Sequence, residues 1–168
     1  GTGTTVITLT ATDVSLNIAN CNFNVVVSDI TPPTITCPGD QNETVNAACQ
    51  FMLPDYTALA VVADNCTASP TVTQAPAPGT TITGATVVTL TANDGNGNTA
   101  NCNFNAIGVD AVAPTAVCQN INVYLNGAGN ASIVAADLDG GSTDNCGSIT
   151  LSASQTSFTC ANLGPNNV

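Results

Sequence analysis

Residues 3–37 read GTTVITLTATDVSLNIANCNFNVVVSDITPPTITC, and residues 84–118 read GATVVTLTANDGNGNTANCNFNAIGVDAVAPTAVC. The two stretches align without a gap at an offset of 81 (84 minus 3), and both contain ANCNFN. Asp64-Asn65-Cys66 likewise recurs as Asp144-Asn145-Cys146, at an offset of 80 (144 minus 64). A fixed period of this length indicates an array of similar structural units. We therefore expect the end of one copy in 1–29, a complete copy in 30–110 and the front of a third copy in 111–168.

Each copy has the pattern of β-structure. Residues 7–11 and 88–92 alternate apolar side chains with threonine, and 21–27 place Cys, Phe and Val on one face. This period of two is typical of half-buried strands. The segment Asp94–Asn98, rich in Gly and Asn, has the composition of a hairpin turn. Short strands separated by turns predict an all-β fold made of β-sandwiches.

The charge composition excludes several classes of function. The chain has no Lys, Arg or His, and its eleven acids give a net charge of −11. Nothing can neutralise a phosphate, so binding to nucleic acid or to an anionic membrane is not expected. Catalysis is not expected either, because a histidine base, a Schiff-base lysine and an arginine clamp are all missing. No apolar run is long enough to insert in a membrane.

Eight cysteines are too many for incidental use in 168 residues. A metal site would require CxxC pairs or histidine partners, and the sequence has neither. Scattered cysteines in an even number favour disulfides, and hence an extracellular or cell-surface location.

Three motifs in the complete copy resemble the hyalin-repeat (HYR) family of immunoglobulin-like modules. They are TPPTITCP at Thr31–Pro38, ADNC at Ala63–Cys66 and TANDGNGNTANCNF at Thr91–Phe104. The third copy is similar to a variant common in long secreted bacterial surface proteins, with APTAVCQNINVYL at Ala113–Leu125, NASIVAADLDGGSTDNCG at Asn130–Gly147 and SFTCANLG at Ser157–Gly164. The resemblance implies tandem immunoglobulin-like β-sandwich domains, linked internally by disulfides, that serve as extracellular stalks, adhesive arms or connectors without catalysis.

Taken with this resemblance, the repeat suggests a set of disulfides. The cysteine of the first strand of a copy is expected beside the cysteine of the last strand, which predicts Cys37–Cys102. The middle cysteines of the complete copy are then expected to pair as Cys49–Cys66. In the third copy we expect Cys146–Cys160.

Cys21 and Cys118 have no partner within their own partial copies. Either they are free thiols, or Cys118 bonds the equivalent of Cys21 in a neighbouring copy. Residues 1–29 supply only the last two strands of a sandwich, and such a hairpin is not stable alone. Copies could then join within one long polypeptide, of which this chain is an excerpt, or as separate subunits by strand complementation. Both routes give a linear array.

The aspartates gather in turns and at the ends of copies, where hard cations find oxygen ligands. With no basic residue to offset their charge, calcium is the expected counter-ion. The alternative for each aspartate is a role in a local turn. The candidate ligands are the cluster of Asp137, Asp139 and Asp144, which lie within eight residues, the equivalent Asp29 and Asp110 at the ends of copies, and Asp64 and Asp94.

The sequence supports two functional hypotheses. The first is a structural building block of an extracellular filament or stalk, made of copies of itself head to tail. The second is a cell-surface adhesin arm or a carbohydrate-binding accessory module. Three sequons, at Asn42, Asn65 and Asn130, would suit surface glycans in a secreted protein.

Overall fold

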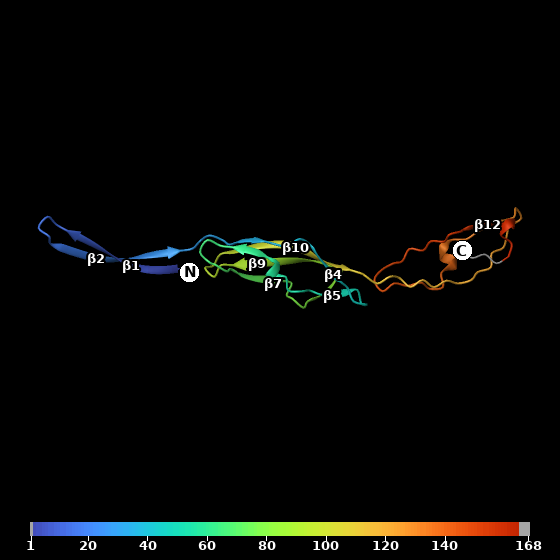
Figure 1. Cartoon of the computed structure of the whole chain (residues 1–168), viewed down its shortest axis with the longest axis horizontal. Helices are drawn as coiled ribbons and strands as arrows, with labels where there is room; N and C mark the ends of the chain where they lie inside the picture. The colour runs from blue at the N-terminus through green and yellow to red at the C-terminus, as the bar shows by residue number, and fades with distance from the viewer. Residues whose placement is uncertain (1, 165–168) are drawn as a thin grey trace. The chain divides into compact units, whose positions relative to one another are not determined.

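The computed structural model describes residues 2–164, and these are all-β, with no α-helix among them (Figure 1). No helix in this range has the length and hydropathy of a membrane span. The expected fold class, consistent with disulfide-linked immunoglobulin-like sandwiches, is confirmed. The strands are β1 (Thr2–Thr12), β2 (Ile18–Ser28), β3 (Thr34–Thr36), β4 (Gln41–Thr44), β5 (Gln50–Met52), β6 (Val61–Ala63), β7 (Thr71–Ala75), β8 (Thr81–Thr83), β9 (Ala85–Asn93), β10 (Thr99–Val109), β11 (Asn130–Ser132) and β12 (Ser157–Thr159). Three short 3-10 helices are η1 (Thr57–Leu59), η2 (Ala135–Leu138) and η3 (Cys160–Asn162).

The chain divides into two compact units. The first contains Gly1–Glu43 and Phe51–Gly108, and the second contains Thr44–Gln50 and Val109–Val168. The three predicted ranges, 1–29, 30–110 and 111–168, stay predictions, and Gly1 and 165–168 lie outside the described residues.

The core of the first unit is built on a four-stranded sheet in the order β4-β10-β9-β7. Two shorter strand pairs, β3–β6 and β5–β8, form separate two-stranded sheets. Alternate residues of β9 and β10 point into this core, as the period of two predicts. Tyr56 packs edge-on against Phe104, with ring centroids 5.1 Å apart. The buried apolar side chains of the unit include Phe51, Leu53, Tyr56, Val88, Leu90, Ala92, Phe104 and Ala106.

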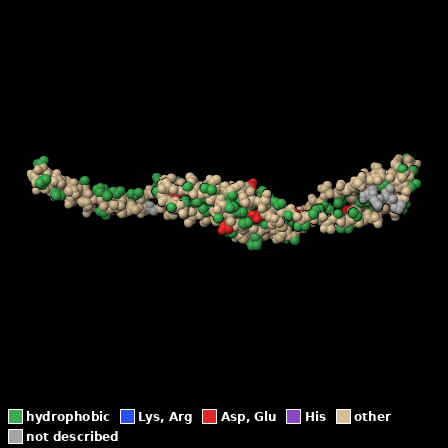
Figure 2. All heavy atoms as spheres, viewed as in Figure 1, with side chains coloured by type: hydrophobic (Ala, Val, Ile, Leu, Met, Phe, Trp, Pro, Cys, Tyr) green, Lys and Arg blue, Asp and Glu red, His purple; other side chains and the backbone are tan. Residues whose placement is uncertain are grey.

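The hairpin β1–β2 belongs to the first unit but contributes nothing to this core. The two strands pair antiparallel from Thr2↔Ser28 to Thr12↔Ile18, and every residue of both strands is exposed. Hydrophobic side chains are visible over this hairpin in the space-filling view (Figure 2). The expected strands are therefore present, while their apolar face has no partner within the described residues.

The second unit repeats the front half of the complete copy in reduced form. β11 pairs with β12, in the way that β5 pairs with β8. The three-residue ladder Thr34↔Ala63 to Thr36↔Val61 between β3 and β6 is replaced by isolated bridges, Thr115↔Thr143 and Cys118↔Asp139. Residues 109–164 contain no counterpart of the paired strands β9 and β10.

Candidate functional site

Three aspartates of the first unit converge at one end of the β9–β10 hairpin. Asp29 follows β2, Asp64 follows β6 and Asp94 opens the turn between β9 and β10. One carboxylate oxygen from each lies within 4.8 Å of the others. Asp94 is only 4% exposed, and the other two are partly buried. All three are among the ligands expected from the sequence, although their meeting as a trio was not.

Local hydrogen bonds fix the orientation of each carboxylate. Asp94 Oδ1 accepts from the backbone N–H groups of Asn96 (2.7 Å) and Asn98 (3.0 Å), as in an Asx turn. Asp29 Oδ2 accepts from Asn96 Nδ2 at 3.0 Å. Asp64 Oδ2 accepts from the backbone N–H of Cys66 at 2.9 Å, but its Oδ1 is buried and has no hydrogen-bond partner. A buried, unpaired carboxylate oxygen is costly unless something positive approaches it.

Hydrogen bonds favour the charged forms of Asp29 and Asp94. The backbone N–H of Thr31 is the main cause that lowers the pKa of Asp29, against partial burial and the repulsion of Asp94. Burial works to raise the pKa of Asp94, but hydrogen bonds from Asn98 and Asn96 outweigh it and hold the pKa below its usual range. Carboxylates kept ionised at this separation repel one another, and the chain has no Lys, Arg or His to compensate. Three such oxygens match the ligand chemistry of calcium.

The other predicted ligands do not form such a group among residues 2–164. Asp137 accepts from the N–H of Val134 (2.8 Å) and Asp139 from the N–H of Ser142 (2.7 Å), so both serve local turns. Asp110 accepts from the N–H of Val112 at 3.0 Å, as its counterpart Asp29 does from Thr31 at 3.1 Å. Asp144 resembles Asp64 in having a buried Oδ1 without a partner. The predicted cluster of Asp137, Asp139 and Asp144 is therefore not assembled, although Asp110 and Asp144 repeat the settings of Asp29 and Asp64.

The first disulfide has the pairing that the repeat and the resemblance suggest. Cys37, which follows β3, is bonded to Cys102 on β10, with Cα atoms 5.6 Å apart. It closes a segment with a sequence separation of 65 residues, and so ties the first strand of the complete copy to the last.

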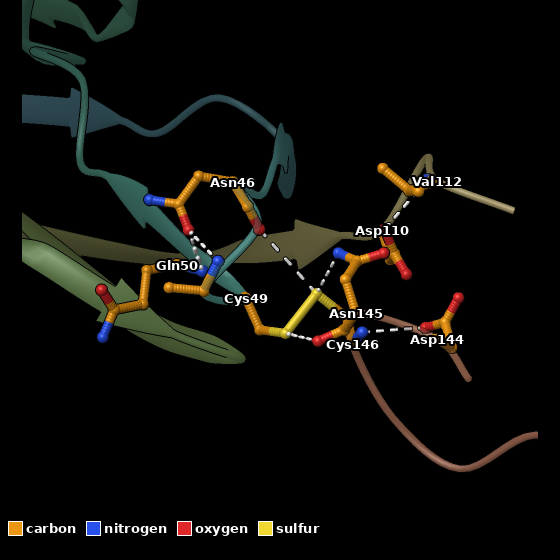
Figure 3. The surroundings of a disulfide bond; sticks show 9 residues. Asn46, Cys49, Gln50, Asp110, Val112, Asp144, Asn145 and Cys146 are labelled. Atoms are coloured by element: carbon orange, nitrogen blue, oxygen red, sulfur yellow. Dashed lines mark hydrogen bonds between the residues drawn. A yellow bond between two sulfur atoms is a disulfide. The ribbon is translucent and has the colours of Figure 1, made fainter. Parts of the chain in front are cut away.

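The second disulfide corrects two expected pairings. Cys49 is bonded to Cys146, with Cα atoms 5.3 Å apart, rather than to Cys66, and Cys146 is consequently not bonded to Cys160 (Figure 3). Within the second unit, this bond joins the loop Asn46–Gln50 to the Asp-Asn-Cys turn of the third copy. The Sγ of Cys49 lies 2.8 Å from the carbonyl oxygen of Asn145.

A cysteine forms only one disulfide, so the bond between Cys49 and Cys146 leaves Cys66 without its expected partner. Cys66 lies in a turn of the first unit, whose Thr67 hydroxyl donates to the carbonyl oxygen of Asp94. Cys49 belongs to the second unit, in the segment Thr44–Gln50.

Four cysteines have free, exposed thiols: Cys21, Cys66, Cys118 and Cys160. The prediction for Cys21 and Cys118 concerned bonds to a neighbouring copy, and it stays a prediction. Cys66 and Cys160 are also free, because their expected partners, Cys49 and Cys146, are bonded to each other.

The second unit contains an open groove of about 950 Å³. It is lined by polar and apolar side chains from the front half of the third copy, and the apolar ones include Val117, Val123, Ile133, Leu138 and Phe158. Ile133, whose N–H donates to the carbonyl of Thr156, is the counterpart of Leu53, which donates to Thr80 in the complete copy. Leu53 is only 1% exposed within the core that β9 and β10 complete. The groove therefore corresponds to the place where a hairpin packs in the complete copy.

The sequon asparagines lie on the surface. Asn42, Asn65 and Asn130 are all exposed. Asn65 Nδ2 donates to Cys66 Sγ at 3.0 Å, and Asn130 Nδ2 donates to the carbonyl of Ala128 at 3.3 Å. Glycans at these positions stay a prediction.

Comparison with known proteins agrees with the repeat and its motifs. Residues 28–107 match the family model described as HYR domain. The chain is also similar to Hyalin of Strongylocentrotus purpuratus, with 32% identity over 159 residues, which are 89% of this chain and 13% of Hyalin. The chain thus spans about an eighth of that relative, and no solved structure matches it. The expected likeness to bacterial surface proteins stays a prediction.

Proposed function

We propose that this chain is a structural, non-catalytic building block of an extracellular filament or stalk, in which HYR copies join end to end. The observation that carries the proposal is the pair of unfilled halves. Within residues 2–164, the hairpin β1–β2 has an exposed apolar face, and the groove in the second unit, which is lined by polar and apolar side chains, has no paired strands equivalent to β9 and β10. The disulfides are consistent with secretion.

The complete copy supplies the template for this fit. Leu90 and Phe104 of β9 and β10 are 0% and 5% exposed within the core. Their counterparts in the first hairpin, Leu9 and Phe23, are 59% and 48% exposed. The hairpin thus carries the side chains that the groove needs, and its insertion into the groove of a neighbouring copy adds the missing strands. Because donor and acceptor surfaces differ, each joint leaves the next one open and the array grows lengthwise.

The experiment that tests this function is electron microscopy of the purified chain, with variants of the hairpin. We expect lengthwise fibres from the unaltered chain. Leu9→Asp places a charge on the inserted face and should abolish them. Asn20→Asp is the matched control, because its counterpart Asn101 remains exposed in the complete copy. Fibres that persist in Leu9→Asp, or are lost equally in both variants, contradict the proposal.

The mass of the chain from its natural source, measured under reducing denaturation, decides whether copies are separate subunits or parts of one polypeptide. A mass near 16.6 kDa indicates subunits, and a much larger mass indicates a long tandem protein. The adhesin and carbohydrate-binding alternatives predict monomers that bind glycans or cell surfaces. Monomers with that binding would replace the filament proposal.

We further propose that calcium binds at Asp29, Asp64 and Asp94 and stiffens the link between the hairpin and the complete copy. Asp29 lies at the end of the hairpin, while the other two belong to loops of the complete copy. The support is the convergence of three carboxylates within 4.8 Å, with one buried oxygen that lacks a donor. A divalent cation offsets their repulsion, which no basic side chain can do.

Thermal melts in calcium and in EDTA test this ion site. We expect calcium to raise the melting temperature by on the order of 10 °C at about 100 times its Kd. Asp64→Asn should remove most of this increase. Asp55→Asn is the control, because Asp55 caps its own turn through Thr57. A melting temperature unchanged by EDTA would refute the calcium proposal.

A further inference from the structure

Cys66 occupies the same local setting as Cys146, which is disulfide-bonded. The N–H of Cys146 donates to Asp144 at 2.8 Å, and the N–H of Cys66 donates to Asp64 at 2.9 Å. The preceding asparagine donates to the sulfur in both turns, at 2.9 Å in the third copy and 3.0 Å in the complete copy. The turn at Cys66 is therefore shaped like the turn that accepts Cys49 of the copy before it.

The loop that carries Cys49 also recurs in the third copy. The Oδ1 of Asn46 accepts from the N–H groups of residues 48 and 50, and the Oδ1 of Asn126 accepts from those of residues 128 and 130. Cys49 and its counterpart Gly129 both have left-handed backbone conformations, with φ of 61° and 77°. The loop at Asn126 therefore has the same shape as the loop at Asn46, but it has a glycine at the position equivalent to Cys49.

Cys160 brings a sulfur to that same place from another element. It begins η3, directly after β12, and β12 pairs with β11 beside the loop. A Cβ atom built on Gly129 would lie 2.9 Å from Cys160 Sγ, which leaves no space for a second cysteine side chain. Because the Cys160 thiol is exposed, the third copy presents one reactive sulfur at the loop position from which Cys49 bonds Cys146.

We propose that Cys160 of one copy of this chain bonds Cys66 of the next copy, repeating across each chain-to-chain joint the bond Cys49–Cys146. The inference rests on the proposed end-to-end assembly. It adds to Cys118–Cys21 a second covalent link at the same joint, so that all four free thiols acquire partners. The first link fastens the inserted hairpin to the groove, and the second fastens the completed copy to the one that follows.

The bond forms by thiol–disulfide exchange. The two thiols lose two protons and two electrons in total, a sulfur–sulfur bond forms, and a small disulfide such as oxidised glutathione is reduced to two thiols.

Peptide mapping of the full chain tests the proposal. The 168-residue chain is assembled in a glutathione redox buffer, alkylated, and digested without reduction. To separate bonds between chains from bonds within one chain, equal amounts of unlabelled and ¹⁵N-labelled chain are mixed before assembly. We expect a linked peptide pair containing Cys66 and Cys160, about half of it of mixed isotope.

Two variants give the test its specificity. Cys160→Ala should leave Cys66 alkylated in the assembled chain. Adding Gly129→Cys to Cys160→Ala returns the sulfur to the loop, in the position that Cys49 has, and should restore a link to Cys66. Failure of this rescue while the turn remains folded counts against the proposed geometry.

The outcomes distinguish this inference from the function on which it rests. If Cys21–Cys118 forms between chains while Cys66 and Cys160 stay alkylatable, the inference is overturned and the end-to-end assembly stands. A link from Cys66 to Cys49 also overturns it. A monomeric chain with four free thiols overturns both.

Discussion

The hairpins β1–β2 and β9–β10 differ in what surrounds them far more than in their own structure. Asp13 Oδ1 accepts from the N–H groups of Ser15 and Asn17, both at 2.8 Å. Asp94 makes the equivalent bonds in the other turn, and both pairs of strands are antiparallel in matching register. One hairpin is nevertheless exposed throughout, whereas the other supplies most of a core.

The comparison shows that local sequence determines the hairpin, while the front half of a copy determines its burial. A two-stranded hairpin is marginal by itself, and its apolar face must find a second layer. Burial of one large aliphatic side chain contributes about 2 kcal/mol, so the exposed face of β1–β2 represents a substantial driving force for association. The following predictions test this difference, from the largest effect to the smallest.

Removing the disulfide of the complete copy should have the largest effect. Cys37→Ser with Cys102→Ser frees a segment of 65 residues and should lower the free energy of unfolding by about 4 kcal/mol. Urea denaturation of the unassembled chain measures the loss. Cys21→Ser, at the position equivalent to Cys102 in the exposed hairpin, should leave that free energy unchanged. Equal losses in the two cases would mean that the first hairpin already has a partner.

Truncating equivalent leucines should give the next largest difference. Leu90→Ala removes a fully buried side chain and should cost about 3 kcal/mol. Leu9→Ala should change the stability of the unassembled chain little, because Leu9 is 59% exposed. In fibres, Leu9→Ala should lower the stability against urea by about as much as Leu90→Ala does. Equal costs of the two changes in the unassembled chain would contradict the difference in burial.

Swapping leucine and glycine should have opposite effects in the turns of the hairpins β1–β2 and β9–β10. Leu16 has a left-handed backbone with φ of 68°, at the position that Gly97 holds with φ of 106°. Leu16→Gly removes a conformational cost of about 1 kcal/mol and should slow hydrogen exchange in β1 and β2. Gly97→Leu should accelerate exchange in β9 and β10. If Leu16→Gly leaves exchange unchanged, the cost of the left-handed leucine is relieved in another way.

The smallest expected effect concerns pH. The N–H and side chain of Asn105 on β10 donate to Asp40 and lower the pKa of that carboxyl below its ordinary value of 3.8. Because the folded pKa is the lower one, the contribution is present above pH 3.8 and is lost as the pH falls through the folded pKa. Asp40→Asn should therefore reduce the acid sensitivity of urea unfolding slightly. Asn24→Ala, at the position in β2 equivalent to Asn105, should leave the pH profile unaltered.

Much of the architecture follows from the sequence because it depends on local patterns. The alternation in 88–92 and the Asp94–Asn98 turn predict the β9–β10 hairpin, and the repeat points to the Cys37–Cys102 bond. The partners of Cys49 and Cys146 were predicted incorrectly, because the pairings Cys49–Cys66 and Cys146–Cys160 assumed that each copy closes on its own cysteines. The lengths and positions of the folded strands decide which turn of one copy meets which loop of the next. The sequence pattern does not contain that information.

The aspartates show the same limit. The repeat shows that Asp29 is equivalent to Asp110 and that Asp64 is equivalent to Asp144. All four are predicted ligands. Convergence of Asp29 and Asp64 with Asp94 is not visible, since it requires three loops to meet. The spacing of Asp137, Asp139 and Asp144 suggested a cluster, but the turns use the first two carboxylates locally.

The most direct test of end-to-end joining is the partner of Cys21 in fibres grown from equal parts of unlabelled and ¹⁵N-labelled chain. If the hairpin of one copy fills the groove of another, Cys21 is recovered bonded to Cys118, with both isotopes in about half of the linked peptides. Recovery of Cys21 and Cys118 as free thiols in intact fibres, or bonded only within single-isotope peptides, would contradict it.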